Sequence, residues 1–273
     1  MVTFDVQLKD ISLRVRTQGE RPNTPIVLVH GVGASLDNWE SVASRLARQF
    51  FVISYDLRGH GSSGKPHDVY TIDGFADDLR NLLDSLNIKS CYLAGHSLGG
   101  MIAQKFTLRF PERVNRLVIV SSACGRTEQE KDAVAARVAA IADGIGGSHF
   151  HASVDRWFTP EFIAENPRLI EAYAARNAEN DPVCYASAYR VLAETDLIKE
   201  ISAIKTPTLI TTGEFDRGSS PSMAKAMHEK IIGSELVIIP KLRHSVLIEA
   251  PQLIAKMLED FFSVKTLDTA RKG

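Results

Sequence analysis

The sequence has almost no net charge, which limits the partners it can have. It carries 32 Lys and Arg against 33 Asp and Glu, a formal charge of −1 over 273 residues. A balanced chain offers no field that attracts the phosphate backbone of a nucleic acid or an anionic membrane surface. We therefore expect no nucleic-acid partner.

Long hydrophobic runs are also absent. No apolar stretch approaches the ~20 residues that a membrane-spanning helix needs. The first residues, MVTFDVQLKD, contain acids where a secretory leader has a basic and then an apolar stretch. These absences predict a cytoplasmic protein that does not bind membranes.

Cysteine is scarce and its spacing fits neither disulfides nor metal ligands. Cys91, Cys124 and Cys184 are odd in number and far apart, so we expect buried, reduced thiols. The pair His149 and His151 offers only two ligands on a Gly-rich segment. No metal and no other cofactor is expected.

The chain does contain a regular alternation of short Val-, Ile- and Leu-rich runs with longer amphipathic stretches. This order predicts an α/β protein with a mostly parallel sheet flanked by helices, opened by an antiparallel hairpin at the sheet edge. The hairpin is expected at 3–8 and 12–16, and strands covered on both faces at 25–30, 51–55, 90–94, 116–121, 208–212 and 235–239. Helices are expected at 38–49, 71–86, 98–110, 221–231 and 251–262.

One interval breaks this alternation. Residues 125–201 contain no convincing strand and read as several helices separated by GIGGSH, by Thr159-Pro160 and by Asp181-Pro182. Strand–helix alternation resumes afterwards, which predicts one core domain formed by 1–124 and 202–273. Residues 125–201 are predicted to be a helical cap inserted between strands, where it covers the strand ends.

The segment between the strand at 90–94 and the following helix carries a G-x-S-x-G motif, Gly95-His96-Ser97-Leu98-Gly99. A serine on a sharp strand-to-helix turn presents its hydroxyl above the sheet, which makes Ser97 the predicted nucleophile. The amide of Leu98 starts the helix and is predicted to face the oxyanion that forms during attack.

A serine nucleophile needs a histidine base and an acid that orients it, and both follow late strands. The strand at 208–212 runs into Gly213-Glu214-Phe215-Asp216, and the strand at 235–239 is followed by His244. We predict His244 as the base and Asp216 as the acid, and Glu214 remains a rival for the acid.

The loop after the first central strand reads His30-Gly31-Val32-Gly33. Its glycines let the backbone approach a substrate closely. The amide of Val32 is the predicted second donor to the oxyanion, and its side chain is free to vary because only the amide is used.

These motifs, together with Asp56-Leu57-Arg58-Gly59-His60-Gly61-Ser62-Ser63, resemble the α/β-hydrolase superfamily over nearly the whole chain. The inserted segment is similar to the 3-oxoadipate enol-lactonase group at Arg156-Trp157-Phe158-Thr159-Pro160, at Asp181-Pro182-Val183-Cys184-Tyr185 and at Glu194-Thr195-Asp196-Leu197. The resemblance implies hydrolysis of a small ester or lactone, such as 3-oxoadipate enol-lactone, through an acyl-serine intermediate and without a cofactor.

An acidic lactone needs a cation for its carboxylate. Arg126, Arg156 and Arg190 are the candidates in the inserted segment, and Trp157 either lines the pocket or holds the cap helices together.

Three alternatives to a lactonase stay open: a general carboxylesterase, a C–C bond hydrolase of aromatic ring-cleavage products, and a small-molecule receptor on the same fold. The chain is expected to be a monomer or a homodimer.

Overall fold

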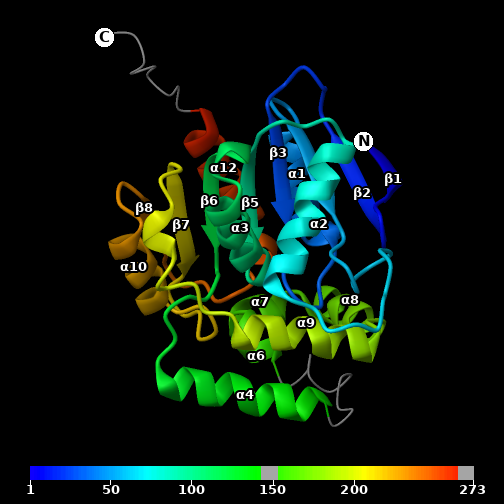
Figure 1. The fold of residues 1–273 in the computed structure, drawn as a ribbon. Coiled ribbons are helices and arrows are strands. Elements are labelled where there is room, and N and C mark those ends of the chain that lie inside the picture. The colour runs from blue at the N-terminus through cyan, green and yellow to red at the C-terminus, as the bar shows by residue number, and fades with distance from the viewer. Residues whose placement is uncertain (143–152, 264–273) are drawn as a thin grey trace.

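A computed structural model describes residues 1–142 and 153–263, and its described strands form one sheet (Figure 1). The strand order is β1-β2-β4-β3-β5-β6-β7-β8. Strand β2 pairs antiparallel with β1 and β4, and every other pairing is parallel. The strands are β1 (Val2–Gln7), β2 (Ser12–Gln18), β3 (Pro25–Val29), β4 (Phe51–Tyr55), β5 (Cys91–His96), β6 (Val114–Val120), β7 (Thr208–Gly213) and β8 (Glu235–Ile239).

The predicted edge hairpin and central strands are confirmed, with one exception. Strand β4 is buried at every residue, and β3 at every residue after its first, as expected for strands covered on both faces. Strand β8 lies at the sheet edge and alternates exposed with covered residues, and Val237 is 37% exposed. The apolar run 235–239 was therefore wrongly expected to be covered on both sides, because sequence order does not reveal which strand has only one neighbour.

Helices cover both faces of the sheet. One buried cluster packs α1 and α12 against one face, and a larger cluster packs α2, α3 and α10 against the other. The helices outside the inserted segment are η1 (Leu36–Trp39), α1 (Glu40–Leu46), α2 (Ile72–Ser85), α3 (Leu98–Arg109), η2 (Pro111–Arg113), η3 (Ile201–Ala203), α10 (Pro221–Lys230), α11 (Val246–Glu249) and α12 (Pro251–Ser263).

Side-chain caps and prolines fix several helix starts. Thr71 Oγ1 accepts a hydrogen bond of 3.0 Å from the amide of Gly74 and caps α2. Ser220 caps α10, and Pro221 occupies its first turn, where the missing N–H is not needed. These local signals place the helix ends close to where the sequence predicts them.

Between β6 and β7 the described part of the chain forms helices joined by loops, and the helices of the inserted segment lie at the carboxyl ends of the parallel strands (Figure 1). They are α4 (Glu128–Ala142), α6 (Val154–Trp157), α7 (Pro160–Glu165), α8 (Pro167–Ala178) and α9 (Pro182–Glu194). The predicted break at GIGGSH and the pair His149 and His151 lie outside the described residues. The domain boundaries at 125 and 201 stay a prediction.

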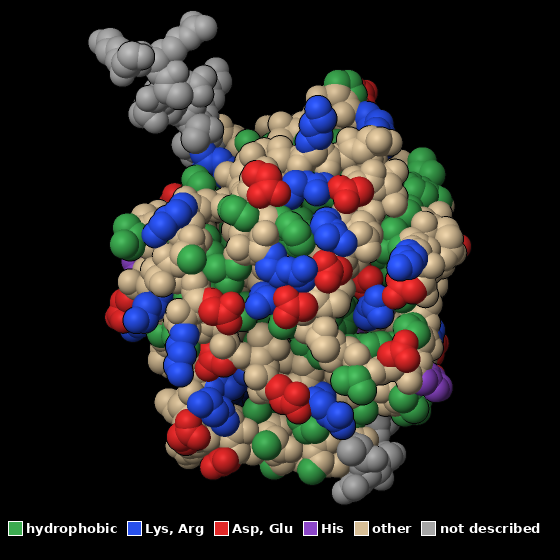
Figure 2. Space-filling view, viewed as in Figure 1, with side chains coloured by type: hydrophobic (Ala, Val, Ile, Leu, Met, Phe, Trp, Pro, Cys, Tyr) green, Lys and Arg blue, Asp and Glu red, His purple; other side chains and the backbone are tan. Residues whose placement is uncertain are grey.

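The surface has mixed charge on the face that Figure 2 shows, where Lys and Arg alternate with Asp and Glu. Many of the Lys and Arg side chains are paired with acids, as Arg113 is with Asp84 at 2.7 Å.

In residues 1–142 and 153–263, no helix combines the length and apolarity that a bilayer crossing requires. All three cysteines are buried and free.

Candidate active site

Ser97 lies on the turn between β5 and α3 and has left-handed backbone angles, φ 56° and ψ −119°. Two glycines make this turn possible. A Cβ at Gly95 would lie 2.1 Å from the carbonyl oxygen of Gly99, and a Cβ at Gly99 would lie 2.2 Å from that of Val29. Contacts this short with backbone atoms exclude any side chain, so the glycines of the motif hold the strained serine in place.

His244 and Asp216 are in direct contact. The Nδ1 atom of His244 lies 2.7 Å from Oδ2 of Asp216. Asp216 follows β7 and is buried, and its Oδ1 accepts the amides of Gly218 at 2.8 Å and Ser219 at 2.9 Å. Burial alone would raise the pKa of Asp216, but the charge of His244 and these hydrogen bonds outweigh it and hold the pKa below its usual range. The ionised carboxylate thus fixes one ring nitrogen of His244.

Glu214, the rival acid, has a different partner. Its Oε2 accepts the amide of Lys241 at 2.9 Å. Of the two acids after β7, Asp216 is therefore the one that contacts His244.

The loop that carries His244 is held by a second histidine that sequence reasoning did not single out for this role. His96 Nε2 lies 3.1 Å from the carbonyl oxygen of His244, and the two rings are 4.9 Å apart. A carbonyl only accepts hydrogen bonds, so Nε2 of His96 carries the proton. Burial lowers the pKa of His96 to about 3, which keeps its ring neutral.

His30 shapes the loop that contains Val32. Its Nε2 accepts the amide of Leu57 at 2.9 Å, and its Nδ1 donates to the carbonyl of Gly31 at 2.7 Å. Burial lowers the pKa of His30 to about 4, so this pattern is that of a neutral ring. Val32 lines the same pocket as Ser97, and Leu98 is the first residue of α3, where a helix leaves its amides unpaired by its own backbone.

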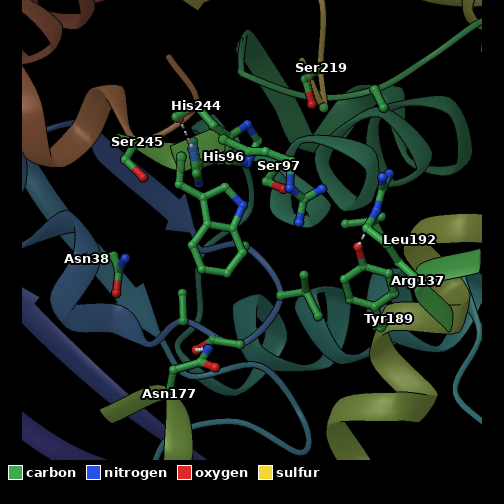
Figure 3. Close-up of a pocket in the computed structure, with 18 of the residues that line it drawn as sticks. Asn38, His96, Ser97, Arg137, Asn177, Tyr189, Leu192, Ser219, His244 and Ser245 are labelled. Atoms are coloured by element: carbon green, nitrogen blue, oxygen red, sulfur yellow. Dashed lines mark hydrogen bonds between the residues drawn. The ribbon is translucent and has the colours of Figure 1, made fainter. Parts of the chain in front are cut away.

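The pocket lies between the strand ends and the inserted helices. Figure 3 shows Ser97 and His244 with Arg137 and Tyr189 in its wall. Trp157 also lines it, and its carbonyl oxygen accepts the amide of Ser245 at 2.8 Å. This bond joins the inserted segment directly to the residue after His244, so Trp157 both lines the pocket and holds the segment in place.

Four arginines line this pocket, and none of its described lining residues is Asp or Glu. They are Arg126, Arg137, Arg156 and Arg176. Nε of Arg137 donates to the hydroxyl of Tyr189 at 3.1 Å (Figure 3). Burial, and next the neighbouring charge of Arg137, lower the pKa of Arg156. Crowded positive charges without lining carboxylates create a site that favours an anion.

The three arginines predicted from the sequence have different surroundings. Arg156 lines the pocket and donates to Ser153 Oγ. Arg126 lines it too, but its guanidinium donates to the carbonyls of Leu192 at 2.9 Å and Thr195 at 3.2 Å, so it caps the end of α9. Arg190 lies outside the pocket, where its side chain is 53% exposed and faces Glu194 at 4.0 Å.

Arg137, Tyr189 and Arg176 are pocket residues that the sequence analysis missed. Arg137 lies in α4, an Ala-rich helix without a recognisable motif. Tyr189 is one residue before Arg190 on α9, and this single step turns a side chain by about 100° around a helix. Only the helix phase could have distinguished the inward Tyr189 from the outward Arg190.

Comparison with known proteins agrees with this geometry. The chain is 29% identical over 251 residues to 3-oxoadipate enol-lactonase 2 of Acinetobacter baylyi, covering 92% of this chain and 93% of the relative. It is 28% identical over 245 residues to (E)-2-((N-methylformamido)methylene)succinate hydrolase of the same species, covering 89% and 90%. The crystal structure of the enol-lactonase from Burkholderia xenovorans LB400 superposes with a TM-score of 0.89 at 26% identity, covering 94% and 99%.

The sequence prediction of fold class is thereby confirmed, and so is the resemblance to the enol-lactonase group. A family profile described as alpha/beta hydrolase fold matches residues 24–251. Because that match spans most of the chain, the protein belongs to the alpha/beta hydrolase family.

Proposed function

We propose that this protein is a serine hydrolase that opens a small carboxylic ester or lactone through an acyl-serine intermediate. The observation that carries the proposal is the contact between His244 and Asp216 beside the strained Ser97, all at the carboxyl ends of parallel strands. A histidine fixed by a carboxylate, lining the same pocket as a serine hydroxyl, is the arrangement that activates a weak nucleophile.

In the proposed mechanism, His244 takes the proton of Ser97 as its Oγ attacks the substrate carbonyl. Asp216 holds the imidazole in the reactive tautomer and stabilises the imidazolium that forms. His244 then protonates the leaving oxygen, and a water activated by the same ring releases the acid. These steps need protein groups and water alone.

The developing oxyanion is assigned to the amides of Leu98 and Val32. The first lies at the start of α3, where the helix dipole also favours negative charge. The second lies on the loop that His30 holds against the pocket. Each donor of this kind is worth about 3 kcal/mol of transition-state stabilisation.

The arginines of the pocket favour a substrate that carries its own carboxylate. Arg137 and Arg156 approach each other without a lining acid, and the relatives named above include an enol-lactonase and a succinate-derivative hydrolase. We infer that the substrate is 3-oxoadipate enol-lactone or a similar acidic lactone. A general carboxylesterase is the second candidate, since the same serine chemistry cleaves neutral esters.

The test compares wild type with Ser97→Ala on p-nitrophenyl acetate, on 3-oxoadipate enol-lactone and on the neutral methyl ester of that lactone. The variant should lose about 10⁴-fold or more in kcat on every substrate while keeping its fold. Covalent labelling of wild type, but not of Ser97→Ala, by a fluorophosphonate would identify the nucleophile. Unchanged hydrolysis by Ser97→Ala contradicts the mechanism, and a preference for the neutral ester supports the carboxylesterase instead.

A further inference from the structure

A second group of reactive side chains lies away from the pocket, where the loop after β4 meets the start of α9. The two segments are joined by hydrogen bonds. The amide of Tyr70 donates to Oγ of Ser187 at 2.9 Å, and that hydroxyl donates to the carbonyl of Asp68 at 2.9 Å. This contact fixes one inserted helix on the core.

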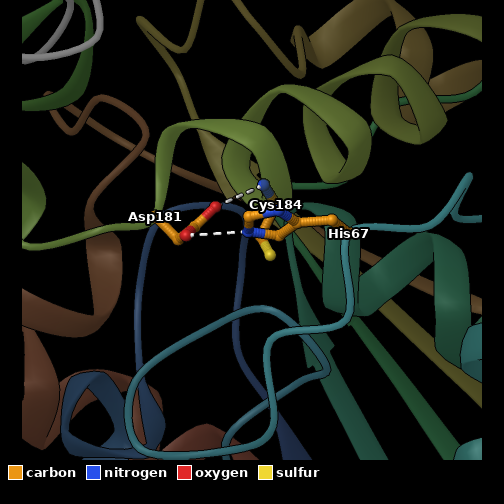
Figure 4. A group of neighbouring side chains, drawn as sticks. All are labelled: His67, Asp181 and Cys184. Carbon is orange, nitrogen blue, oxygen red and sulfur yellow. Dashed lines mark hydrogen bonds and ion pairs between the residues drawn. The ribbon is translucent and has the colours of Figure 1, made fainter.

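Three potential metal ligands converge at this contact (Figure 4): His67 from the loop, Asp181 from the cap of α9 and Cys184 from its first turn. Nε2 of His67 lies 3.1 Å from Oδ2 of Asp181, and the two atoms and the Cys184 sulfur all lie within 4.8 Å of one another. Asp181 and Cys184 lie 114 and 117 positions after His67 along the chain, so no sequence spacing reveals the group.

The carboxylate of Asp181 is fixed in orientation. Its Oδ1 accepts the amides of Val183 at 3.0 Å and Cys184 at 2.9 Å, which caps α9. The other oxygen is thereby turned toward His67.

We propose that His67, Asp181 and Cys184 bind a thiophilic divalent cation of the zinc class. Sulfur, imidazole nitrogen and carboxylate oxygen are the donors that Zn²⁺ prefers, whereas Mg²⁺ and Ca²⁺ select oxygen alone. Water supplies the fourth position of a tetrahedral site.

One pair of ligand atoms already has nearly the spacing that a bound ion requires, and the Cys184 sulfur lies within 4.8 Å of both. Bonds of about 2.0–2.3 Å place tetrahedral ligand atoms roughly 3.3–3.7 Å apart, and the His67–Asp181 pair is already at 3.1 Å. The His67 side chain is 58% exposed, which leaves a path for the ion, and on binding its Nε2 exchanges the hydrogen bond to Asp181 for the metal. On binding, the Cys184 thiol releases its proton to solvent, and the thiolate and the carboxylate together neutralise the two positive charges.

Besides the hydrogen bonds through Ser187, a bound ion would be a second link between α9 and the loop after β4. Helix α9 carries Tyr189, the partner of Arg137 in the pocket wall, so the ion would fix the pocket wall without contacting the substrate. The inference does not rest on the proposed hydrolase activity.

The test is titration of tag-free full-length protein with Co²⁺, which reports thiolate ligation by a near-ultraviolet charge-transfer band and tetrahedral geometry by its visible bands. One equivalent should bind with both signals. Cys184→Ser should abolish the charge-transfer band, and His67→Ala should weaken binding at least about tenfold. Cys124→Ser, which removes another buried thiol, is the matched control and should bind like wild type.

Thermal unfolding gives a second readout, because an ion that binds only the folded state raises Tm. At a Zn²⁺ concentration that saturates wild type, Tm should rise clearly more for wild type and Cys124→Ser than for His67→Ala, whose exposed side chain can be removed without opening the core. Wild type that binds Co²⁺ without a thiolate band, or no more tightly than Cys184→Ser and His67→Ala, would overturn the proposal.

Discussion

The imidazole Nδ1 of His244 and the carboxylate Oδ2 of Asp216 lie 2.7 Å apart although they follow different strands of the sheet. Strands β7 and β8 are parallel neighbours, so their carboxyl ends bring the two loops together. Because the contact uses Nδ1, the other ring nitrogen, Nε2, is the one that the proposed mechanism uses to take the proton of Ser97.

Asp216→Asn should therefore impair catalysis more than folding. An amide can donate to Nδ1 of His244 and favour the wrong tautomer, so we expect kcat to fall by about 10⁴-fold with little change in KM. Steady-state kinetics on p-nitrophenyl acetate measures both constants.

Glu214→Gln is the matched control, since Glu214 leaves the same strand but contacts the amide of Lys241. It should retain kcat close to that of wild type. If Glu214→Gln were the slower of the two variants, the acid would be wrongly assigned.

The same contact predicts a pH dependence of stability. The folded protein holds the pKa of Asp216 below its usual range. Asp216 therefore binds a proton more weakly in the folded state than in the unfolded state. Its ionised form therefore contributes stability above the unfolded pKa of about 4, and this contribution disappears as the pH falls through the lower folded pKa.

Urea unfolding of wild type and Asp216→Asn at several pH values between about 7 and about 3 measures this effect. The difference between the two free energies of unfolding should shrink as the pH falls below about 4. Other carboxylates titrate in both proteins and cancel from the difference. A difference that stays constant over the range would show that Asp216 carries no such linkage.

Local patterns predicted much of the fold. The central strands are continuous apolar runs, and the helices carry caps and apolar faces. Short windows of the sequence are therefore enough to predict both the strands and the helices. Strand β8 was misjudged because burial on its second face depends on a neighbour that the fold does not supply. That information is tertiary, and no window of sequence contains it.

The candidate site divides in the same way. Ser97, Asp216 and His244 were predictable because each follows a strand whose end is fixed by the parallel sheet. In the inserted segment, Trp157, Arg126 and Arg156 were expected and line the pocket. Tyr189 was missed and Arg190 was wrongly expected, because the two are neighbours in sequence and only the rotation of α9 sends the tyrosine inward. His67 and Cys184 meet solely because two distant segments pack together.

Arg137 and Arg156 should decide whether the pocket prefers charged substrates. If they bind a substrate carboxylate, Arg137→Met removes charge-assisted hydrogen bonds worth about 1.5–3 kcal/mol, and kcat/KM for 3-oxoadipate enol-lactone should fall about 10- to 100-fold. Hydrolysis of neutral p-nitrophenyl acetate should stay near wild type, because that substrate makes no such bond. Arg190→Met, which removes an exposed arginine of the same region, should leave both reactions unchanged. An equal loss on charged and neutral substrates would instead show that Arg137 acts by positioning Tyr189, its hydrogen-bond partner at 3.1 Å.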